Sequence, residues 1–562
     1  MTAALSVGLT VGVTVGLAAA AARWIGRHPW SVSWDEAHYL ERVHLDAQCL
    51  AADGLGGFAR ALLGADRRRP PAYRLLVAPF LLVGGIGVRR ARLATLACYP
   101  ATVALVLVAV GRPAGWAAGG TAAALVAVSP MALGACMRFY ADAPLYVGIA
   151  GTTWFLGELM ATDAPPWWAG LGLAGALVVG GLAKTSFVLV AGPMVAAAVG
   201  LTAAGRFSEG RLVDFALPLV GAALVLAPWW GRNGRPALRY GRYSSEFSRH
   251  SMDAPAGLVR AAAWARTLGR SVLGQGAAAV TALVWVAWVT VWVTDGQPNS
   301  DVELAVMFSA MAGVPALPLG ALRSSNHNPR LAGPAVVPLA VATGLAARGL
   351  PASLDPAMGV AAAVLVMQAL VILRSASRDP AYDRGCATAR GGLWPGPAGA
   401  LLPVEQWDWS GLRDLCVRAG LTAPSIAYLG NAEGMSPPQI RFPWVVGGTV
   451  PEVHWLWRYE DGPIDWEVVR SRAATAAVVV TVPGIIGHVP DRHDEDNRHS
   501  AEFASLLAAS DEFVEVGRLG VGRFERTSVR VFSPARSRAG SRPDSSRPHS
   551  SRTDRRRTWT SA

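Results

Sequence analysis

The segment ALSVGLTVGVTVGLAAAAA (residues 4–22) is followed a few residues later by SWDEAHY (residues 33–39). The first stretch contains no charged residue and, as an α-helix, reaches most of the way across a hydrocarbon core of about 30 Å. It has no basic start, and Arg23 and Arg27 follow it, so we expect a retained membrane anchor rather than a cleaved signal peptide. This helix delivers two adjacent carboxylates, Asp35 and Glu36, to the membrane surface.

Apolar segments of similar length recur throughout residues 1–375. They cover residues 72–88, 91–111, 115–134, 144–161, 167–183, 186–204, 212–230, 276–294, 302–322, 331–348 and 356–374. In the whole chain 52% of the residues are hydrophobic and only 16% are charged, compared with about 25% charged in soluble domains. This composition excludes a single soluble domain and a disordered chain. It predicts a polytopic α-helical membrane protein of about 11–13 spans.

The net charge of +12 does not indicate a nucleic-acid partner. Much of the positive charge lies beside apolar segments or in residues 534–562, where membrane topology accounts for it. Among the 51 basic residues, Lys184 is the single lysine, a bias typical of a GC-rich bacterial genome. A lysine retained despite such a bias is a candidate for a chemical role. Retention by chance is an alternative of equal weight.

The chain changes character after residue 375. Residues 376–400 are rich in Gly, Pro and Arg and are predicted to form a linker. Residues 401–533 alternate between helical and strand patterns, which predicts a soluble α/β domain. The Ser/Arg-rich tail, residues 534–562, is predicted to be disordered. Within the soluble domain we expect helices at 409–419 and 500–509 and strands at 425–429, 476–482, 513–516 and 527–532.

The polar residues gather on one face if segment 72–88 does not span the membrane. This segment follows a Pro-Pro pair and contains Pro79 and two glycines, which weaken a helix. About eleven spans then remain, and the outer loop 23–70, Asp142, Lys184 and the soluble domain share one face, expected to be extracytoplasmic. We prefer this arrangement to twelve spans because charged groups at membrane depth usually mark a site. The expected location is the plasma membrane.

The polar motifs at the ends of the apolar segments form an ordered series. They are Asp35-Glu36-Ala37-His38-Tyr39, Arg69-Pro70-Pro71-Ala72-Tyr73-Arg74, Arg138-Phe139-Tyr140-Ala141-Asp142, Ala183-Lys184-Thr185, Trp229-Trp230-Gly231-Arg232-Asn233 and Asn328-Pro329-Arg330-Leu331. In this order the series resembles the polyprenyl-phosphate-sugar-dependent glycosyltransferases of the GT-C superfamily, above all the protein O-mannosyltransferase and lipid A aminoarabinose transferase group. The resemblance covers residues 5–350. Each motif alone is weak, whereas the six in family order are fairly specific.

The resemblance implies roles for three acidic residues. Asp35 matches the residue that opens the first outer loop, a candidate general base on the acceptor hydroxyl. Glu36 matches its neighbour, which orients Asp35 or joins it in holding a divalent cation; no other cofactor is expected. Asp142 matches the second acidic site of the family. On chemistry alone, a helix cap at Asp35 has about half the weight.

Basic and aromatic residues complete the predicted site. A donor of this kind carries a phosphodiester, and the planar fork of arginine matches phosphate oxygens. The predicted substrate-binding residues are Tyr39, Arg69, Arg74, Arg138, Lys184, Trp230, Arg232 and Arg330. Two positions depart from the family, since Arg69 stands where His is usual and Lys184 precedes its threonine instead of following it. Interfacial anchoring of the arginines by snorkelling is the alternative.

The sequence thus predicts a membrane glycosyltransferase. It would move a sugar from a polyprenyl-phosphate donor to a lipid, glycan or protein acceptor by one inverting displacement, with Asp35 as the base. A transporter or flippase of a lipid-linked or anionic substrate is the alternative, although transporters more often carry their charges at the bilayer midplane. A third interpretation is a non-catalytic scaffold whose acidic residues only cap helices.

Overall fold

The computed structural model describes residues 3–27, 34–83, 87–161, 165–206, 212–246, 257–296, 298–323, 329–377, 408–429, 435–457, 463–481, 494–520 and 528–535. Linker residues 378–400, tail residues 536–562 and Asn328 lie outside these ranges. The chain divides into a helical unit, Met1–Trp409 with Glu433–Val450, and a second unit, Ser410–Ala432 with Pro451–Ala562. Residues 433–450 therefore group with the helices, although they lie within the range expected for the soluble domain.

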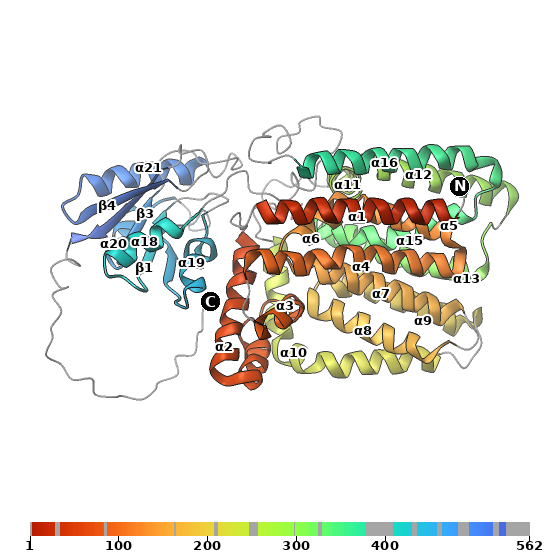
Figure 1. The fold of residues 1–562 in the computed structure, drawn as a ribbon, viewed down its shortest axis with the longest axis horizontal. Helices are drawn as coiled ribbons and strands as arrows, with labels where there is room; N and C mark the ends of the chain where they lie inside the picture. The colour runs from red at the N-terminus through yellow and green to blue at the C-terminus, as the bar shows by residue number, and fades with distance from the viewer. Residues whose placement is uncertain are drawn as a thin grey trace. The chain divides into compact units, whose positions relative to one another are not determined.

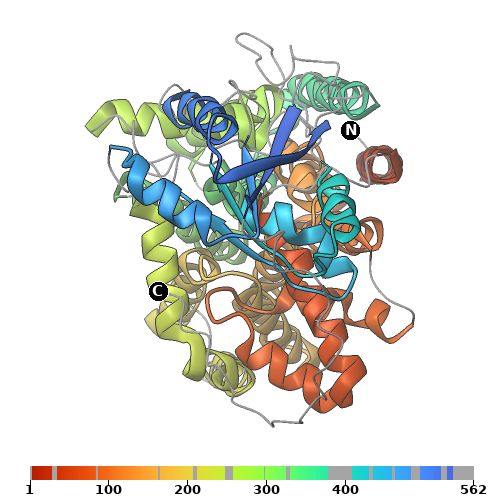
Figure 2. The ribbon, with the colours of Figure 1, turned by 90° about the vertical axis from the view of Figure 1, so that its left-hand side faces the viewer.

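The helical unit is a bundle with α2 lying across one of its ends (Figure 1). Figure 2 shows α1 and α16 end-on and next to each other at the edge of the bundle. The helices are α1 (Ala3–Arg27), α2 (Trp34–Gly64), α3 (Ala72–Leu82), α4 (Val88–Ala114), α5 (Trp116–Ala127), α6 (Pro130–Met137), α7 (Asp142–Ala161), α8 (Trp167–Ala183), α9 (Phe187–Leu201), α10 (Leu212–Glu246), α11 (Gly257–Thr267), α12 (Gln275–Asp295), α13 (Asp301–Arg323), α14 (Pro329–Ala332), α15 (Val336–Arg348), α16 (Asp355–Ser377) and α19 (Pro437–Val446).

Seven helices in the described part of the chain are long and apolar enough to cross a membrane, or eight if α5 and α6, bent by 59°, form one span. The polytopic helical fold is confirmed. The predicted number of about 11–13 spans is higher because it also counted segments such as α8, which has 17 residues. At 11 residues, α3 is about 16 Å long, which agrees with the expectation that segment 72–88 does not span.

Small residues let the helices approach closely, as is common in lipid. At Gly148 of α7, an added Cβ would lie 2.5 Å from the Cα of Gly180 in α8. The break between α5 and α6 is capped by Ser129, whose hydroxyl accepts a hydrogen bond from the Ala132 N–H and donates one to the Val272 carbonyl. These contacts hold α7, α8 and α6 in place, and all three helices lead into the site described below.

α2 begins with Trp34, Asp35 and Glu36 and turns at Gly54, whose φ of 63° favours glycine. A small hydrophobic core beneath its first turns joins several elements. It contains Tyr39, Leu40, Val43, Tyr73, Val77, Val88, Ala91, Ala94, Phe139, Tyr140, Ala141 and Phe442. The first part of α2 is therefore supported by α3, α4 and α19 rather than by its own hydrogen bonds alone.

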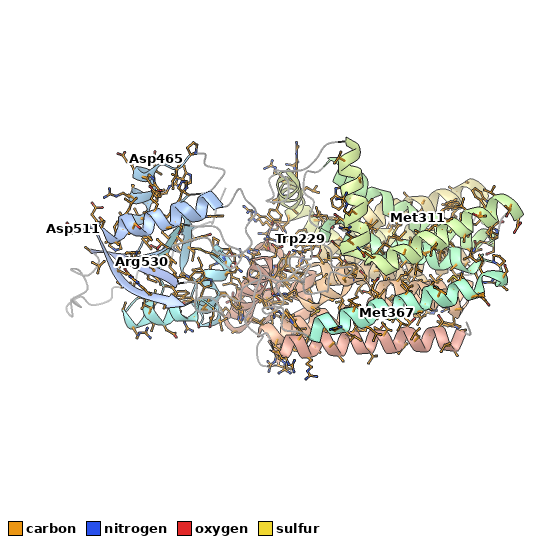
Figure 3. The ribbon with its side chains drawn as sticks, turned by 90° about the horizontal axis from the view of Figure 1, so that it is seen from above. Trp229, Met311, Met367, Asp465, Asp511 and Arg530 are labelled. Atoms are coloured by element: carbon orange, nitrogen blue, oxygen red, sulfur yellow. The ribbon has the colours of Figure 1, made fainter. Side chains whose placement is uncertain are left out.

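The second unit contains a five-stranded sheet of order β2-β1-β3-β5-β4. β1 (Ser425–Leu429) is parallel to β2 (Glu452–Trp455) and β3 (Val478–Thr481), while β5 (Ser528–Pro534) is antiparallel to β3 and to β4 (Phe513–Gly520). Its helices are α18 (Ser410–Arg418), α20 (Trp466–Ala474) and α21 (Asp494–Ala508). Figure 3 labels Arg530 of β5, which pairs with Glu515 of β4, and Asp465, which caps α20. The predicted α/β character is confirmed.

Candidate active site

One arginine joins the two acidic residues that the sequence singled out. Arg330 donates from Nη1 to Asp35 at 2.7 Å and from Nη2 to Asp142 at 2.6 Å. Lys184 also donates to Asp142, at 2.8 Å, and Arg69 lies 3.9 Å from Asp35. Three cations thus surround two carboxylates in this cluster.

Helix ends bring these residues together. Asp35 lies in the first turn of α2 and Asp142 in the first turn of α7, where the helix dipole favours a negative charge. Lys184 caps the end of α8, and Arg330 lies in the short α14 that leads into α15. A charged side chain inside the bilayer carries a large free-energy cost. Placement at a helix end avoids this cost.

The two carboxylates differ in their access to solvent. The Asp35 side chain is 36% exposed, whereas that of Asp142 is 2% exposed. Burial alone would raise the pKa of Asp35, but Arg330 and Arg69 outweigh it and hold the pKa below its ordinary value. Lys184 is 25% exposed. Asp35 and Lys184 are therefore the most solvent-accessible members of the cluster, while the buried Asp142 pairs with both Lys184 and Arg330.

Aromatic rings form the floor of the cluster. The Arg330 guanidinium lies 4.0 Å from the centre of the Tyr140 ring. Arg69 lies 5.5 Å from the ring of Tyr39 and donates to the hydroxyl of Tyr240 at 2.6 Å. Cation–π contacts of this kind restrict a guanidinium to one plane. The structure thus places the Tyr39 ring against the Arg69 guanidinium, on the same helix as Asp35.

Glu36 points away from Asp35 into the helical unit. Both of its oxygens are taken, by Arg92 at 2.6 and 2.7 Å, by Arg138 at 3.0 Å and by the Phe139 N–H at 2.9 Å. Burial would raise the pKa of Glu36, but the two arginines lower it to about 2. Both guanidiniums also face the ring of Trp24. Glu36 and Arg138 thus form a buried network beside the cluster instead of joining it.

The remaining predicted residues have other partners. Arg74 is buried against Asp46 and so ties α3 to α2. Trp230 donates to the Gly181 carbonyl of α8 at 3.0 Å, and its ring meets that of Trp229 edge-on. Arg232 is exposed near Gly64, at the end of α2. These three residues frame the site, whereas Asp35, Arg69, Asp142, Lys184 and Arg330 meet within it.

Sequence reasoning missed Asp66, His38 and Tyr240. Asp66 accepts the backbone N–H groups of Arg68 and Arg69 at 3.0 and 3.2 Å, and it lies 3.3 Å from His38 Nε2. Asp66 therefore shapes the turn that presents Arg69. His38 follows Asp35 by three positions on a helix and hence shares its face; that spacing was the available signal. Nothing in the sequence pointed to Tyr240.

The residues present do not fit a resident divalent cation. No group of three His, Cys, Asp or Glu side chains suited to a metal occurs in the described ranges. Asp35 is paired with Arg330, and Glu36 is saturated by different partners. Metal ions prefer several carboxylates aimed at one point, which this geometry does not provide.

Comparison with known proteins shows the fold. No protein-family model and no curated protein matches the sequence. Two crystal structures of ArnT from Cupriavidus metallidurans match the chain, each at 13% identity. The form bound to undecaprenyl phosphate has a TM-score of 0.54 and covers 94% of this chain and 98% of its own. The apo form has a TM-score of 0.53 and covers 94% and 97%. The chain therefore shares the fold of these ArnT structures.

Proposed function

We propose that this protein is a multi-pass membrane glycosyltransferase that takes a sugar from a polyprenyl-phosphate carrier. The observation that carries the proposal is the cluster of Arg330, Lys184 and Arg69 around Asp35 and Asp142, on a fold shared with ArnT. The ArnT structure bound to undecaprenyl phosphate supports a carrier of the same chemical class. The acceptor is a hydroxyl-bearing lipid, glycan or protein on the extracytoplasmic side of the plasma membrane.

The cations would bind the donor phosphate and stabilise its departure. The acceptor oxygen attacks the anomeric carbon as the bond from that carbon to the phosphate oxygen breaks. The electron pair of the broken bond stays on the phosphate, which gains negative charge near Arg330, Arg69 and Lys184. Positioned cations that meet a developing charge are usually the largest catalytic contribution. The products are the glycosylated acceptor and the polyprenyl phosphate, with inversion at the anomeric carbon.

Asp35 would accept the proton that the acceptor loses. It is the more exposed carboxylate, and its lowered pKa keeps it in the ionised form, the form that can accept a proton. Asp142 would act as a positioning residue, because its two oxygens hold Lys184 and Arg330 side by side. The two carboxylates thus have different tasks, which their different exposure supports.

The alternative function, a transporter or flippase, predicts charged residues at a different depth in the membrane. In transporters, substrate sites lie near the bilayer midplane at broken helices. Here the cluster lies at the starts of α2 and α7 and at the end of α8. This arrangement favours chemistry at the membrane surface over passage through the membrane.

The test uses purified full-length protein in nanodiscs with radiolabelled polyprenyl-phosphate sugars and a cell-envelope lipid and glycan extract. The expected result is a labelled acceptor, and its formation should be lost in Asp35→Asn. Movement of labelled donor across vesicle membranes, without a new glycosidic product, would establish the transporter instead.

A further inference from the structure

We propose that Arg441 on α19 is a positioning residue for the proposed transfer. Through Glu41 it holds the first turns of α2, and hence Asp35, in register with Arg330. The predicted effect on the rate of transfer rests on the proposed function. The inference also makes a purely structural claim, that residues 433–450 complete the helical unit.

The sequence before and within α19 contains residues that favour the start of a helix. Ser436 is the N-cap, Pro437 and Pro438 open the first turn, and Gln439 follows at the third position. Ser436 Oγ donates to Gln439 Oε1 at 2.7 Å. Proline is favoured at the start of a helix. Ser436 and Gln439 have the Ser-x-x-Gln spacing of a capping box, but their side chains bond each other and the Ser436 side chain makes no cap hydrogen bond to the helix backbone. This helix interrupts the chain between β1 and β2 and packs in the helical unit instead of with the sheet.

α19 and α2 are joined by an ion pair between Arg441 and Glu41. Arg441 donates from Nε and Nη2 to the same oxygen of Glu41, at 2.9 and 2.6 Å. The Glu41 side chain is only 3% exposed. Removal of one partner from a buried pair leaves the other charge uncompensated, which costs far more than the pair itself contributes. Glu41 therefore depends on α19 for its neutralisation.

An apolar contact accompanies this pair. Phe442, the next residue on α19, belongs to the core that also contains Tyr39 and Tyr140. Its ring lies 5.9 Å from that of His44 on α2. Tyr140 supports Arg330, and Tyr39 supports Arg69. α19 thus contributes to the packing beneath both arginines of the site.

Loss of the Arg441–Glu41 pair would affect Asp35 because the segment of α2 between Glu41 and Asp35 is short and helical. Glu41 follows Asp35 by six residues, about 9 Å along a helix. Glu36 anchors the same turns to Arg92 and Arg138. α2 is therefore held by charge pairs from three helices, α3, α4 and α19, and by the Arg138 segment. A misplacement of about 1 Å at a reacting group lowers a rate by about 100-fold. A rotation of α2 after loss of Arg441 would move Asp35 by such an amount.

The test compares Arg441→Ala, Arg441→Lys and the exchange Glu41→Arg/Arg441→Glu in the full chain. Arg441→Ala should lower kcat about 10- to 100-fold with little change in the KM for the donor, because the phosphate-binding cations remain. Arg441→Lys should recover part of the rate, and the exchange should recover most of it. Arg470→Ala, which breaks the exposed Arg470–Glu512 pair of the second unit, is the control and should leave kcat unchanged.

A second readout requires no transfer activity. In an Asp35→Cys background, the labelling rate of the thiol by a water-soluble maleimide should change several-fold with Arg441→Ala and return with the exchange. Unaltered labelling and unaltered kcat in Arg441→Ala would overturn the inference. If the wild-type protein transfers no sugar but labelling still responds to Arg441, the proposed function fails and the positioning of α2 stands.

Discussion

Asp35 and Asp142 accept hydrogen bonds from the two ends of one guanidinium, that of Arg330, at 2.7 and 2.6 Å. They are far apart in the sequence and belong to different helices, α2 and α7. Without a ligand, Arg330 is occupied by both carboxylates. An incoming phosphate therefore competes with Asp35 for this arginine, and we expect its binding to release the carboxylate that is to act as the base.

Asp35→Asn should abolish most of the transfer activity. The amide keeps the size of the side chain but cannot accept a proton, so kcat should fall by at least about 100-fold. Binding of polyprenyl phosphate should persist or improve, because one competitor for Arg330 is removed. The matched control is Asp53→Asn, which alters an exposed carboxylate on the same helix. A transfer rate equal to that of the wild type would remove the base assignment.

Lys184→Met should weaken donor binding. A hydrogen bond to a charged group contributes about 1.5–3 kcal/mol, equivalent to roughly 10- to 150-fold in affinity. The dissociation constant for polyprenyl phosphate, measured by titration in nanodiscs, should rise within this range. Arg60→Ala, at an exposed pair on α2, is the control for loss of a positive charge. Unchanged affinity would assign Lys184 to structure alone.

Glu36→Gln should lower stability, and any fall in kcat should come from displacement of α2 rather than from loss of a proton-transfer group. It leaves Arg92 and Arg138 buried without their counterion, at a cost of about 3–5 kcal/mol, and the midpoint of thermal unfolding should fall accordingly. Because the folded-state pKa of Glu36 is depressed to about 2 from 4.5, the carboxylate contributes fully above pH 4.5. That contribution is lost as the pH falls from 4.5 towards 2. The difference in unfolding midpoint between Glu36→Gln and the wild type should be constant from pH 6 to 8 and should shrink in acid. A difference that grows in acid would contradict the assignment of Glu36 as an ionised, paired carboxylate.

Gly148→Ala should separate α7 from α8. The added methyl group would lie 2.5 Å from the Gly180 backbone, which has no side chain that could move aside. Since α7 carries Asp142 and α8 ends at Lys184, both thermal stability and donor affinity should fall. Gly175→Ala is the control on α8, because no atom lies within 4 Å of its added methyl group. Equal unfolding midpoints for the two variants would show that this close approach is not required.

The sequence determined the class of fold and the helix ends at which the charged residues lie. Long apolar segments leave few alternatives in a membrane, since their backbone polar groups must be satisfied within each helix. Charged residues are confined to the ends of these segments by the cost of burial in lipid. For this reason, and from the order of their motifs, the sequence placed Asp35, Asp142, Lys184 and Arg330 in one predicted site, together with seven further residues.

Only the tertiary structure decided how neighbouring residues divide between site and support. Asp35 and Glu36 are adjacent, but successive residues on a helix point about 100° apart, and the rotation of α2 depends on what packs beneath it. That rotation directs Asp35 to Arg330 and Glu36 to Arg92. The same holds for Arg138 and Arg74, and for residues 433–450, which join the helical unit through Glu41. Contacts between segments so distant in the chain depend on packing that no local pattern encodes.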